Sequence, residues 1–174
     1  MSVLALPRNA GQQRAILAGL AAARGRAVVV MDADLEDPPE AIPALRAGLD
    51  GAAAVFAGRS GAYESRGRLA TSRLFKRLNA VLCGVPSDAG AFVALRREAV
   101  DAVLRLQGPP PVLTSMIGVS GVSAVSIPVE RSARAVGRSA YGAVARSRAG
   151  LRGLAWGLVW RFGLLRRVAA RRTA

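Results

Sequence analysis

A short apolar run that leads directly into two aspartates constrains this chain more than any other stretch. Residues 28–31 read Val-Val-Val-Met, and residues 32–39 read Asp-Ala-Asp-Leu-Glu-Asp-Pro-Pro. The valines predict a buried strand, because β-branched residues favour strands. The polar residues follow where that strand would leave the sheet, and open α/β sheets bind ligands outside the carboxyl ends of their strands. The stretch therefore predicts a functional site at Asp32 and Asp34.

Asp32 and Asp34 are candidate metal ligands. Two carboxylates separated by one residue repel each other unless a cation lies between them, and Mg²⁺ or Mn²⁺ prefers such oxygen ligands. Mg²⁺ usually takes one or two carboxylates together with the phosphates of a substrate. The alternative is that both are loop residues, one of which caps the next helix. Glu36 and the two prolines favour the metal site, because the whole string is far rarer than Asp-x-Asp alone.

The composition fits one folded domain without a disulfide. Of the 174 residues, 52% are hydrophobic and 21% are charged, which is typical of a globular protein. The single cysteine, Cys83, excludes an internal disulfide, which fits a reducing compartment. Cys83 lies in an apolar run, so we expect its side chain to be buried. The chain has no histidine, so acid–base chemistry would use carboxylates and a metal site would be built from oxygen.

The formal net charge of +14 is unevenly distributed. Six acidic residues lie between positions 32 and 50, whereas no acidic residue and eleven arginines follow Glu130. Such a block favours an anionic partner, namely lipid phosphate, an anionic membrane surface or nucleic acid. No signal peptide is evident, because Arg8 and Asn9 interrupt the first apolar stretch. No uncharged run reaches the ~18–20 residues that span a bilayer.

Patterns along the chain predict alternating strands and helices. The expected strands are residues 2–6, 28–31, 53–57, 91–95 and 122–129. The expected helices are residues 9–23, with Asn9 and Gln12 as a capping box, then 40–49, 69–82, 97–106, 112–117 and a stretch beginning at 142. The first five elements alternate strand, helix, strand, helix and strand, which favours a parallel, layered α/β sheet.

The last part of the chain predicts a basic amphipathic helix. Leu151, Leu154 and Leu158 can share one face, with Trp156 and Trp160 placed for an interface. An arginine-rich amphipathic helix that carries tryptophans suits the surface of an anionic membrane. The alternative is an ordinary surface helix that packs on the sheet and keeps its arginines in water.

Several segments, in order, resemble the family-2 inverting glycosyltransferases, and most closely the branch that acts on polyprenyl phosphates such as dolichyl phosphate. These segments are residues 8–15, 31–39, 58–59, 64–65, 72–75, 87–92 and 131–141. The resemblance covers nearly the whole chain. It implies a GT-A fold, which is a Rossmann-like layered α/β sheet with helices on both faces. It also implies a partial glycosyltransferase domain at 1–142, followed by a basic amphipathic helical tail at 143–174.

The implied activity is the transfer of a sugar, with inversion, from a nucleotide-diphosphate donor to a polyprenyl phosphate such as dolichyl or undecaprenyl phosphate. The resemblance places Asp32 nearer the donor and Asp34 on a Mg²⁺ or Mn²⁺ ion, with Glu36 as a further metal neighbour. Such a cation would neutralise the charge that develops on the leaving nucleoside diphosphate. Glu36 stands where the family usually has glutamine, and this departure bears on the choice of metal.

The acceptor phosphate is already an anionic nucleophile, so the reaction needs no general base, which fits the lack of histidine. Arg59, Arg131 and Arg134 match the arginines that contact this phosphate in the family, and Ser139 would add a hydrogen bond. The planar guanidinium suits this role because it binds phosphate through paired hydrogen bonds. Asp88 matches a recurrent acidic position and is a catalytic candidate. Its role stays open between base, ligand of a substrate hydroxyl and loop anchor.

One departure concerns the start of the chain. The family has an earlier strand, acidic loop and helix that hold the base and ribose of the donor, and no counterpart precedes Arg8. We therefore expect an N-terminally truncated enzyme that binds its donor weakly or is inactive. A fragment, a start codon placed too far downstream and a degenerate paralogue all fit this expectation.

Two other functions stay open beside this one. A family-2 transferase with a hydroxyl acceptor would use Asp88 as its base, whereas a degenerate, non-catalytic basic module would need no site. Nucleic acid is not an expected partner, because that interpretation rests on charge alone and acidic residues gather at the proposed cleft. The expected location is cytoplasmic, peripheral on the cytoplasmic face of the membrane.

Overall fold

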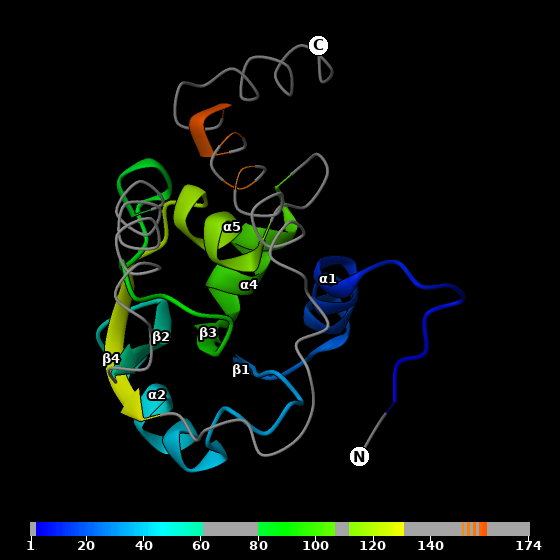
Figure 1. Cartoon of the computed structure of the whole chain (residues 1–174). Helices are drawn as coiled ribbons and strands as arrows, with labels where there is room; N and C mark the ends of the chain where they lie inside the picture. The colour runs from blue at the N-terminus through cyan, green and yellow to red at the C-terminus, as the bar shows by residue number, and fades with distance from the viewer. Residues whose placement is uncertain are drawn as a thin grey trace, which may run out of the picture.

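Helices and strands alternate along the described chain. A computed structural model describes residues 3–60, 80–106 and 112–130, together with positions 151, 153, 155 and 157–159. The elements are α1 (Gln12–Ala22), β1 (Ala27–Val30), the 3-10 turn η1 (Pro39–Ala41), α2 (Ile42–Gly48), β2 (Ala54–Ser60), β3 (Val93–Arg96), α4 (Arg97–Leu104), α5 (Leu113–Val119) and β4 (Ala124–Glu130) (Figure 1). Residues 80–83 are also helical, as are the described positions between 151 and 159.

The four strands form one mixed sheet in the order β1-β3-β2-β4. Strand β3 lies between β1 and β2 and runs antiparallel to both, whereas β4 runs parallel to β2. The expected parallel arrangement is therefore wrong for β1 and β2: they point the same way, but a later strand separates them. The alternation of apolar and polar residues along a strand shows which face of the sheet each side chain occupies. It does not show which strand pairs beside it or in which direction that strand runs.

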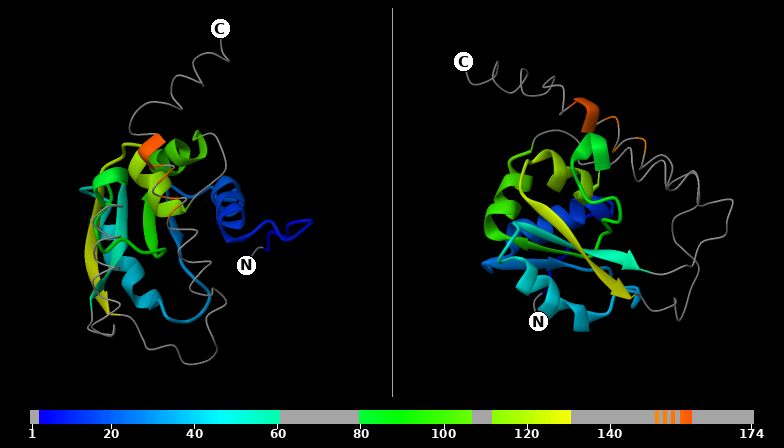
Figure 2. Two further views of the ribbon diagram at one scale, coloured as in Figure 1. Left: turned by 45° about the horizontal axis from the view of Figure 1, so that its top comes forward. Right: turned by 90° about the vertical axis from the view of Figure 1, so that its left-hand side faces the viewer.

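Helices cover both faces of the sheet, so the expected layered α/β fold is confirmed (Figure 2). Helices α1, α4 and α5 pack on one face, where Leu20 and Ile117 join a cluster with Phe56. Helix α2 packs on the other face, where Leu45 joins Val55. Val55 and Phe56 are neighbours in the chain and face opposite layers, as the period of two requires. Phe56 is fully buried, at 0% exposure.

The start of the chain corrects two expectations. Residues 3–6 form no strand, and this segment runs outward from α1, away from the sheet (Figure 1). Val3 and Leu4 are 82% and 56% exposed, so their side chains do not contribute to the core. The capping box is also absent: Asn9 Oδ1 accepts the backbone N–H of Gly11 at 3.0 Å, and α1 begins only at Gln12. Gly11 adopts a φ of 80°, which delays the start of the helix.

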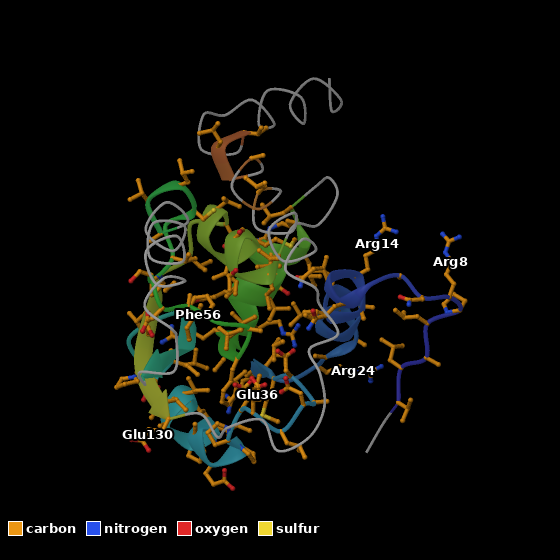
Figure 3. All side chains as sticks on the ribbon, in the orientation of Figure 1. Arg8, Arg14, Arg24, Glu36, Phe56 and Glu130 are labelled. Atoms are coloured by element: carbon orange, nitrogen blue, oxygen red, sulfur yellow. The ribbon has the colours of Figure 1, made fainter. Side chains whose placement is uncertain are left out.

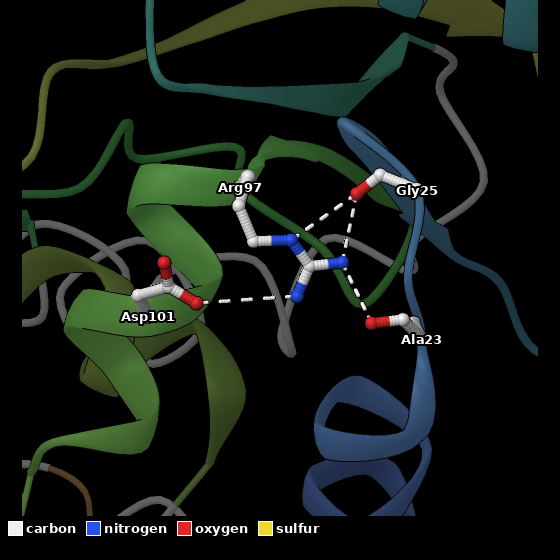
Figure 4. Close-up of polar contacts among 4 residues, drawn as sticks. All are labelled: Ala23, Gly25, Arg97 and Asp101. Carbon is white, nitrogen blue, oxygen red and sulfur yellow. Dashed lines mark hydrogen bonds and ion pairs between the residues drawn. The ribbon is translucent and has the colours of Figure 1, made fainter.

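Arg97 joins the beginning of α4 to the connection between α1 and β1. Its guanidinium donates to the carbonyl oxygen of Ala23 at 2.7 Å and to that of Gly25 at 2.7 and 3.1 Å (Figure 4). A longer ion pair of 3.9 Å connects it to Asp101, one turn further along α4. The backbone N–H of Arg97 also donates to Arg26 at 2.8 Å. These contacts fix the start of β1 and therefore the place where β1 leads into residues 31–38, which we name the aspartate loop.

Two glycines near the C-terminus lie against the domain. Gly153 and Gly157 are buried, and a Cβ atom at Gly153 would lie 3.1 Å from the Oγ of Ser115. A Cβ atom at Gly157 would press on the sulfur of Cys83. Cys83 is buried, as expected; burial raises the pKa of its thiol, and a hydrogen bond with Ser115 acts in the opposite direction. The expected tail at 143–174 otherwise lies outside the described residues, as does most of the helix expected at 69–82.

The described residues form no helix that combines the length and the apolar character needed to cross a bilayer.

Candidate active site

The ends of three strands bring the candidate residues to one edge of the sheet. Val30, Val93, Phe56 and Ser126 are aligned in one row across the four strands. Just beyond this row β1 continues into the aspartate loop, β2 runs on to Ser60, and β4 ends at Glu130, which pairs with Ser60. In Figure 3, Glu36 and Glu130 both lie beyond Phe56 toward this edge. Adjacent strands lie ~4.8 Å apart, so β1 is about 10 Å from β2.

Gln12 on α1 holds the first aspartate of the loop. Its amide Nε2 donates to Oδ1 of Asp32 at 3.1 Å. Asp32 is half-buried, whereas Asp34 is exposed. The sequence pattern assigned Gln12 only to a capping box, so this contact between positions 12 and 32 was missed. Because α1 covers the same face of the sheet as Phe56, the Asp32 carboxylate lies on that face of the edge.

A tight turn follows around Asp34. Its Oδ1 accepts the backbone N–H of Glu36 at 3.2 Å, and Leu35 between them adopts a φ of 62°. A non-glycine residue in this left-handed region costs about 1–2 kcal/mol. The side chain of Leu35 is 80% exposed, so burial among the described residues does not offset the cost of this backbone conformation. The loop is thus shaped by hydrogen bonds to its own carboxylates and not by burial.

The oxygen atoms of this loop fit a divalent cation that binds together with a substrate. Asp32, Asp34 and Glu36 supply only carboxylates, the ligand type that Mg²⁺ and Mn²⁺ prefer. Among the described residues, no three acidic, histidine or cysteine side chains gather as a ready metal site. A cation held by one or two carboxylates would complete its coordination with phosphate oxygens of a ligand. The three-residue metal site therefore stays a prediction.

Asp88 lies across the end of β2, apart from the aspartate loop. It belongs to the turn that is closed by the hydrogen bond from the N–H of Ala89 to the carbonyl of Pro86 at 3.1 Å. The hydroxyl of Ser126 on β4 donates to Oδ2 of Asp88 at 2.8 Å. No motif in the sequence indicated Ser126; its only signal was a polar residue within an apolar strand pattern.

The predicted acceptor residues are only partly described. The backbone of Arg59 lies one residue before the end of β2, where it pairs with Val129. The side chain of Arg59 is not among the described side chains. Arg131, Arg134 and Ser139 lie outside the described residues.

Basic residues concentrate in the two segments that begin at this edge. The described residues carry nine arginines against ten aspartates and glutamates, and so are nearly neutral. The other sixteen basic residues, with a single acidic one, fall in residues 61–79 and 131–174. Ser60 and Glu130, the last described residues before these two segments, are paired. The sequence is therefore strongly basic where it continues from β2 and β4, and acidic where it continues from β1.

Comparison with known proteins identifies the family. Residues 1–104 match the family described as Glycosyl transferase family 2, and this match includes α1, the aspartate loop and Asp88. The "Uncharacterized glycosyltransferase YkcC" of Bacillus subtilis (strain 168) is 31% identical over 147 residues, which cover 81% of this chain and 45% of that protein. The "Undecaprenyl-phosphate 4-deoxy-4-formamido-L-arabinose transferase" of Enterobacter sp. (strain 638) is 35% identical over 139 residues, which cover 78% and 42%.

The chain spans less than half the length of these two curated relatives. The family match itself covers more than half of the present chain, and the matched residues include β1 and the aspartate loop that follows it. The chain therefore belongs to glycosyl transferase family 2.

Proposed function

We propose that this chain carries the catalytic part of an enzyme that transfers a sugar from a nucleotide-diphosphate donor to a polyprenyl phosphate, with inversion. The observation that carries the proposal is the aspartate loop at the carboxyl end of β1, with Asp32 held by Gln12. Family membership supports a glycosyltransferase. The name of one relative, which specifies an undecaprenyl-phosphate sugar transferase, supports a lipid phosphate as the acceptor.

On the donor side, Asp32 and Asp34 would hold Mg²⁺ or Mn²⁺, with Glu36 as a third candidate ligand. Members of this family generally use a divalent metal. When bound, such a cation offsets the negative charge of the departing nucleoside diphosphate. The contribution of the chain itself is orientation: Gln12 fixes the Asp32 carboxylate, and the N–H of Glu36 fixes that of Asp34.

On the acceptor side, Arg59, Arg131 and Arg134 bind the lipid phosphate, and Ser139 donates a hydrogen bond to it. Arg59 stands near the end of β2, and Arg131 directly follows β4. These strands are paired neighbours, so their ends lie ~5 Å apart, which is close enough for side chains from both to contact one phosphate. Strand β1, which leads into the aspartate loop, lies two strand spacings (about 10 Å) from β2 and three (about 14 Å) from β4.

A lipid acceptor requires that the site works at a membrane surface. The basic segments 61–79 and 131–174 favour contact with anionic lipid. Leu151 and Leu158, near the start of the proposed tail at 143–174, are 65% and 44% exposed and would enter the headgroup region. The protein is accordingly peripheral, on the cytoplasmic face of the membrane, where nucleotide sugars are available.

A transferase with a hydroxyl acceptor is the second candidate, because Asp88 supplies a carboxylate at the same edge of the sheet. A hydroxyl acceptor needs a general base, whereas a phosphate acceptor does not. Transfer to a polyprenol, compared with transfer to the corresponding polyprenyl phosphate, separates the two candidates.

Replacing Arg131 and Arg134 together with alanine should raise the KM for polyprenyl phosphate far more than the KM for the donor. Each lost charge-assisted hydrogen bond is worth about 1.5–3 kcal/mol, so an increase of at least about a hundredfold is expected. Initial rates at varied acceptor and varied donor give the two constants. Replacing Arg171 and Arg172 removes the same charge from the end of the chain and serves as the control. An equal effect on both substrates would contradict the acceptor role.

Replacing Gln12 with alanine should weaken metal-dependent binding of a nucleoside diphosphate by about two- to tenfold, because one net hydrogen bond is worth about 0.5–1.5 kcal/mol. Calorimetric titration in the presence of Mn²⁺ measures the change. The control is Gln13→Ala: Gln13 Oε1 accepts the N–H of Leu113 at 2.8 Å, away from the aspartate loop. That variant should lower stability and leave binding unchanged. If both variants bind equally well, Gln12 does not orient Asp32.

A further inference from the structure

Three residues that are distant in the sequence meet at the end of β2. Asp88 comes from the loop before β3, Ser126 from β4 and Gly58 from β2. The hydroxyl of Ser126 donates to Oδ2 of Asp88 at 2.8 Å in a partly buried position, across 38 residues of chain. Gly58 is buried directly beneath this pair. We name these three residues the Asp88 cluster.

Gly58 provides the space that the Asp88 carboxylate occupies. A Cβ atom at position 58 would overlap both the Oδ2 of Asp88 and the Oγ of Ser126. The register pairs Phe56 with Ser126, and the period of two places Gly58 on the same sheet face as both. On this face, where Phe56 fills the core, the next position along β2 has no side chain, and a carboxylate from another loop lies there instead.

The loop directs Asp88 onto the sheet. Gly84, at a φ of 73°, ends the helix at 80–83, and its N–H donates to Ala80 at 2.8 Å. The turn from Pro86 to Ala89 then carries Asp88 across the end of β2. An aspartate in a surface loop usually samples several rotamers, but this one has a neighbouring hydroxyl and a fitted space. Such support preorganises a side chain for a task that needs a fixed position.

The Asp88 cluster is separate from the aspartate loop. The described contacts of Asp88 are with β4 and with the turn that begins at Pro86, whereas Asp32 is held by Gln12 on α1. Strand β3 lies between β1, which leads into the aspartate loop, and β2, beside whose end Asp88 lies, so these two strands are about 10 Å apart. The strand order thus leaves room for a sugar between the aspartate loop and Asp88.

We propose that Ser126 is a positioning residue, which holds the Asp88 carboxylate at the end of β2 in the space that Gly58 provides. The inference rests on the proposed function, in which Asp88 contacts the substrate. Ser126 engages Oδ2, and Oδ1 is the oxygen through which Asp88 meets a hydroxyl of the sugar or of the acceptor. If the cluster only anchored the loop, losing the hydroxyl would change stability and not turnover.

The test compares Ser126→Ala, Ser126→Thr, Asp88→Asn and the double variant Ser126→Ala/Asp88→Asn in the full chain. We expect Ser126→Ala to lower kcat about tenfold with donor KM within about twofold, the effect of one lost hydrogen bond. Threonine keeps a hydroxyl and should restore kcat. In the Asp88→Asn background, Ser126→Ala should cost nothing further. The matched control is Ser123→Ala: Ser123 Oγ accepts the N–H of Ala53 at 2.9 Å, at the opposite end of β4, and should not affect kcat.

An unchanged kcat for Ser126→Ala would overturn the proposal, as would equal losses in the wild-type and Asp88→Asn backgrounds. Urea unfolding of the same variants measures the coupling between Ser126 and Asp88 without relying on activity. If the wild-type chain transfers no sugar, kcat gives no comparison, but a fall in the urea midpoint caused by Ser126→Ala that disappears in Asp88→Asn still supports the part of the proposal in which the hydroxyl holds the Asp88 carboxylate. Additive shifts in the midpoint would overturn it.

Discussion

Replacing Asp34 with alanine should abolish metal-dependent sugar transfer. The carboxylate lies at the exit of β1, where its Oδ1 is oriented by the N–H of Glu36, and it is exposed to an incoming ligand. Removing a carboxylate that holds the metal forfeits several kcal/mol of transition-state stabilisation, so the rate should fall by on the order of a thousandfold, equivalent to ~4 kcal/mol. Single-turnover transfer of a radiolabelled sugar to polyprenyl phosphate measures the change.

The matched control for Asp34→Ala is Asp50→Ala. Asp50 follows α2 at the opposite edge of the sheet, where its backbone carbonyl accepts a hydrogen bond from Arg96 at 2.9 Å. Alanine keeps that carbonyl and removes only an exposed carboxylate, so transfer should be unchanged. If Asp34→Ala retains wild-type activity while the wild type requires a metal, the aspartate loop is not the metal site.

Replacing Phe56 with alanine should lower the free energy of unfolding by about 3–5 kcal/mol, the range for emptying a fully buried aromatic site. Phe56 is 0% exposed and stands in the row that aligns Val93 and Ser126 beside the site (Figure 3). Because domains are stable by only about 5–15 kcal/mol, the loss would remove much of the total. Urea unfolding followed by circular dichroism provides the measurement.

Val125→Ala is the control for this core substitution. Val125 lies on the neighbouring strand β4 next to Ser126, but it is 43% exposed. Its truncation should cost about 1 kcal/mol or less, since a partly exposed strand position loses little burial. Similar losses for Phe56→Ala and Val125→Ala would show that the core is not organised around Phe56.

Local sequence patterns predicted the helices and strands well where the backbone preferences of single residues determine them. The valine run forms β1 and the double proline precedes α2, because β-branched residues and prolines act through their own backbone preferences. The layered α/β sheet is of the Rossmann-like GT-A type that the family resemblance implied. Residues 3–6 share the apolar composition of a strand but have no strand partner among the described residues, so composition alone gave the wrong answer there.

The sequence singled out candidate site residues only where they lie close together in the chain. Asp32 and Asp34 stand out because the carboxylates follow a strand within one short stretch. The partners Gln12 and Ser126 reach their aspartates through tertiary packing, and no spacing in the sequence encodes those contacts. The position of β3 between β1 and β2 is of the same kind, since strand order is decided by long-range pairing. It is this order that separates Asp88 from the aspartate loop.

Calorimetric titration of the chain with GDP and with UDP, each with and without Mn²⁺, is the first test of the proposed donor site. We predict that one of the two nucleotides binds, that binding requires Mn²⁺, and that Asp34→Ala removes it while Asp50→Ala does not. Binding of the same strength without Mn²⁺, or binding that survives in Asp34→Ala, would contradict the assignment of the loop after β1 as the donor site.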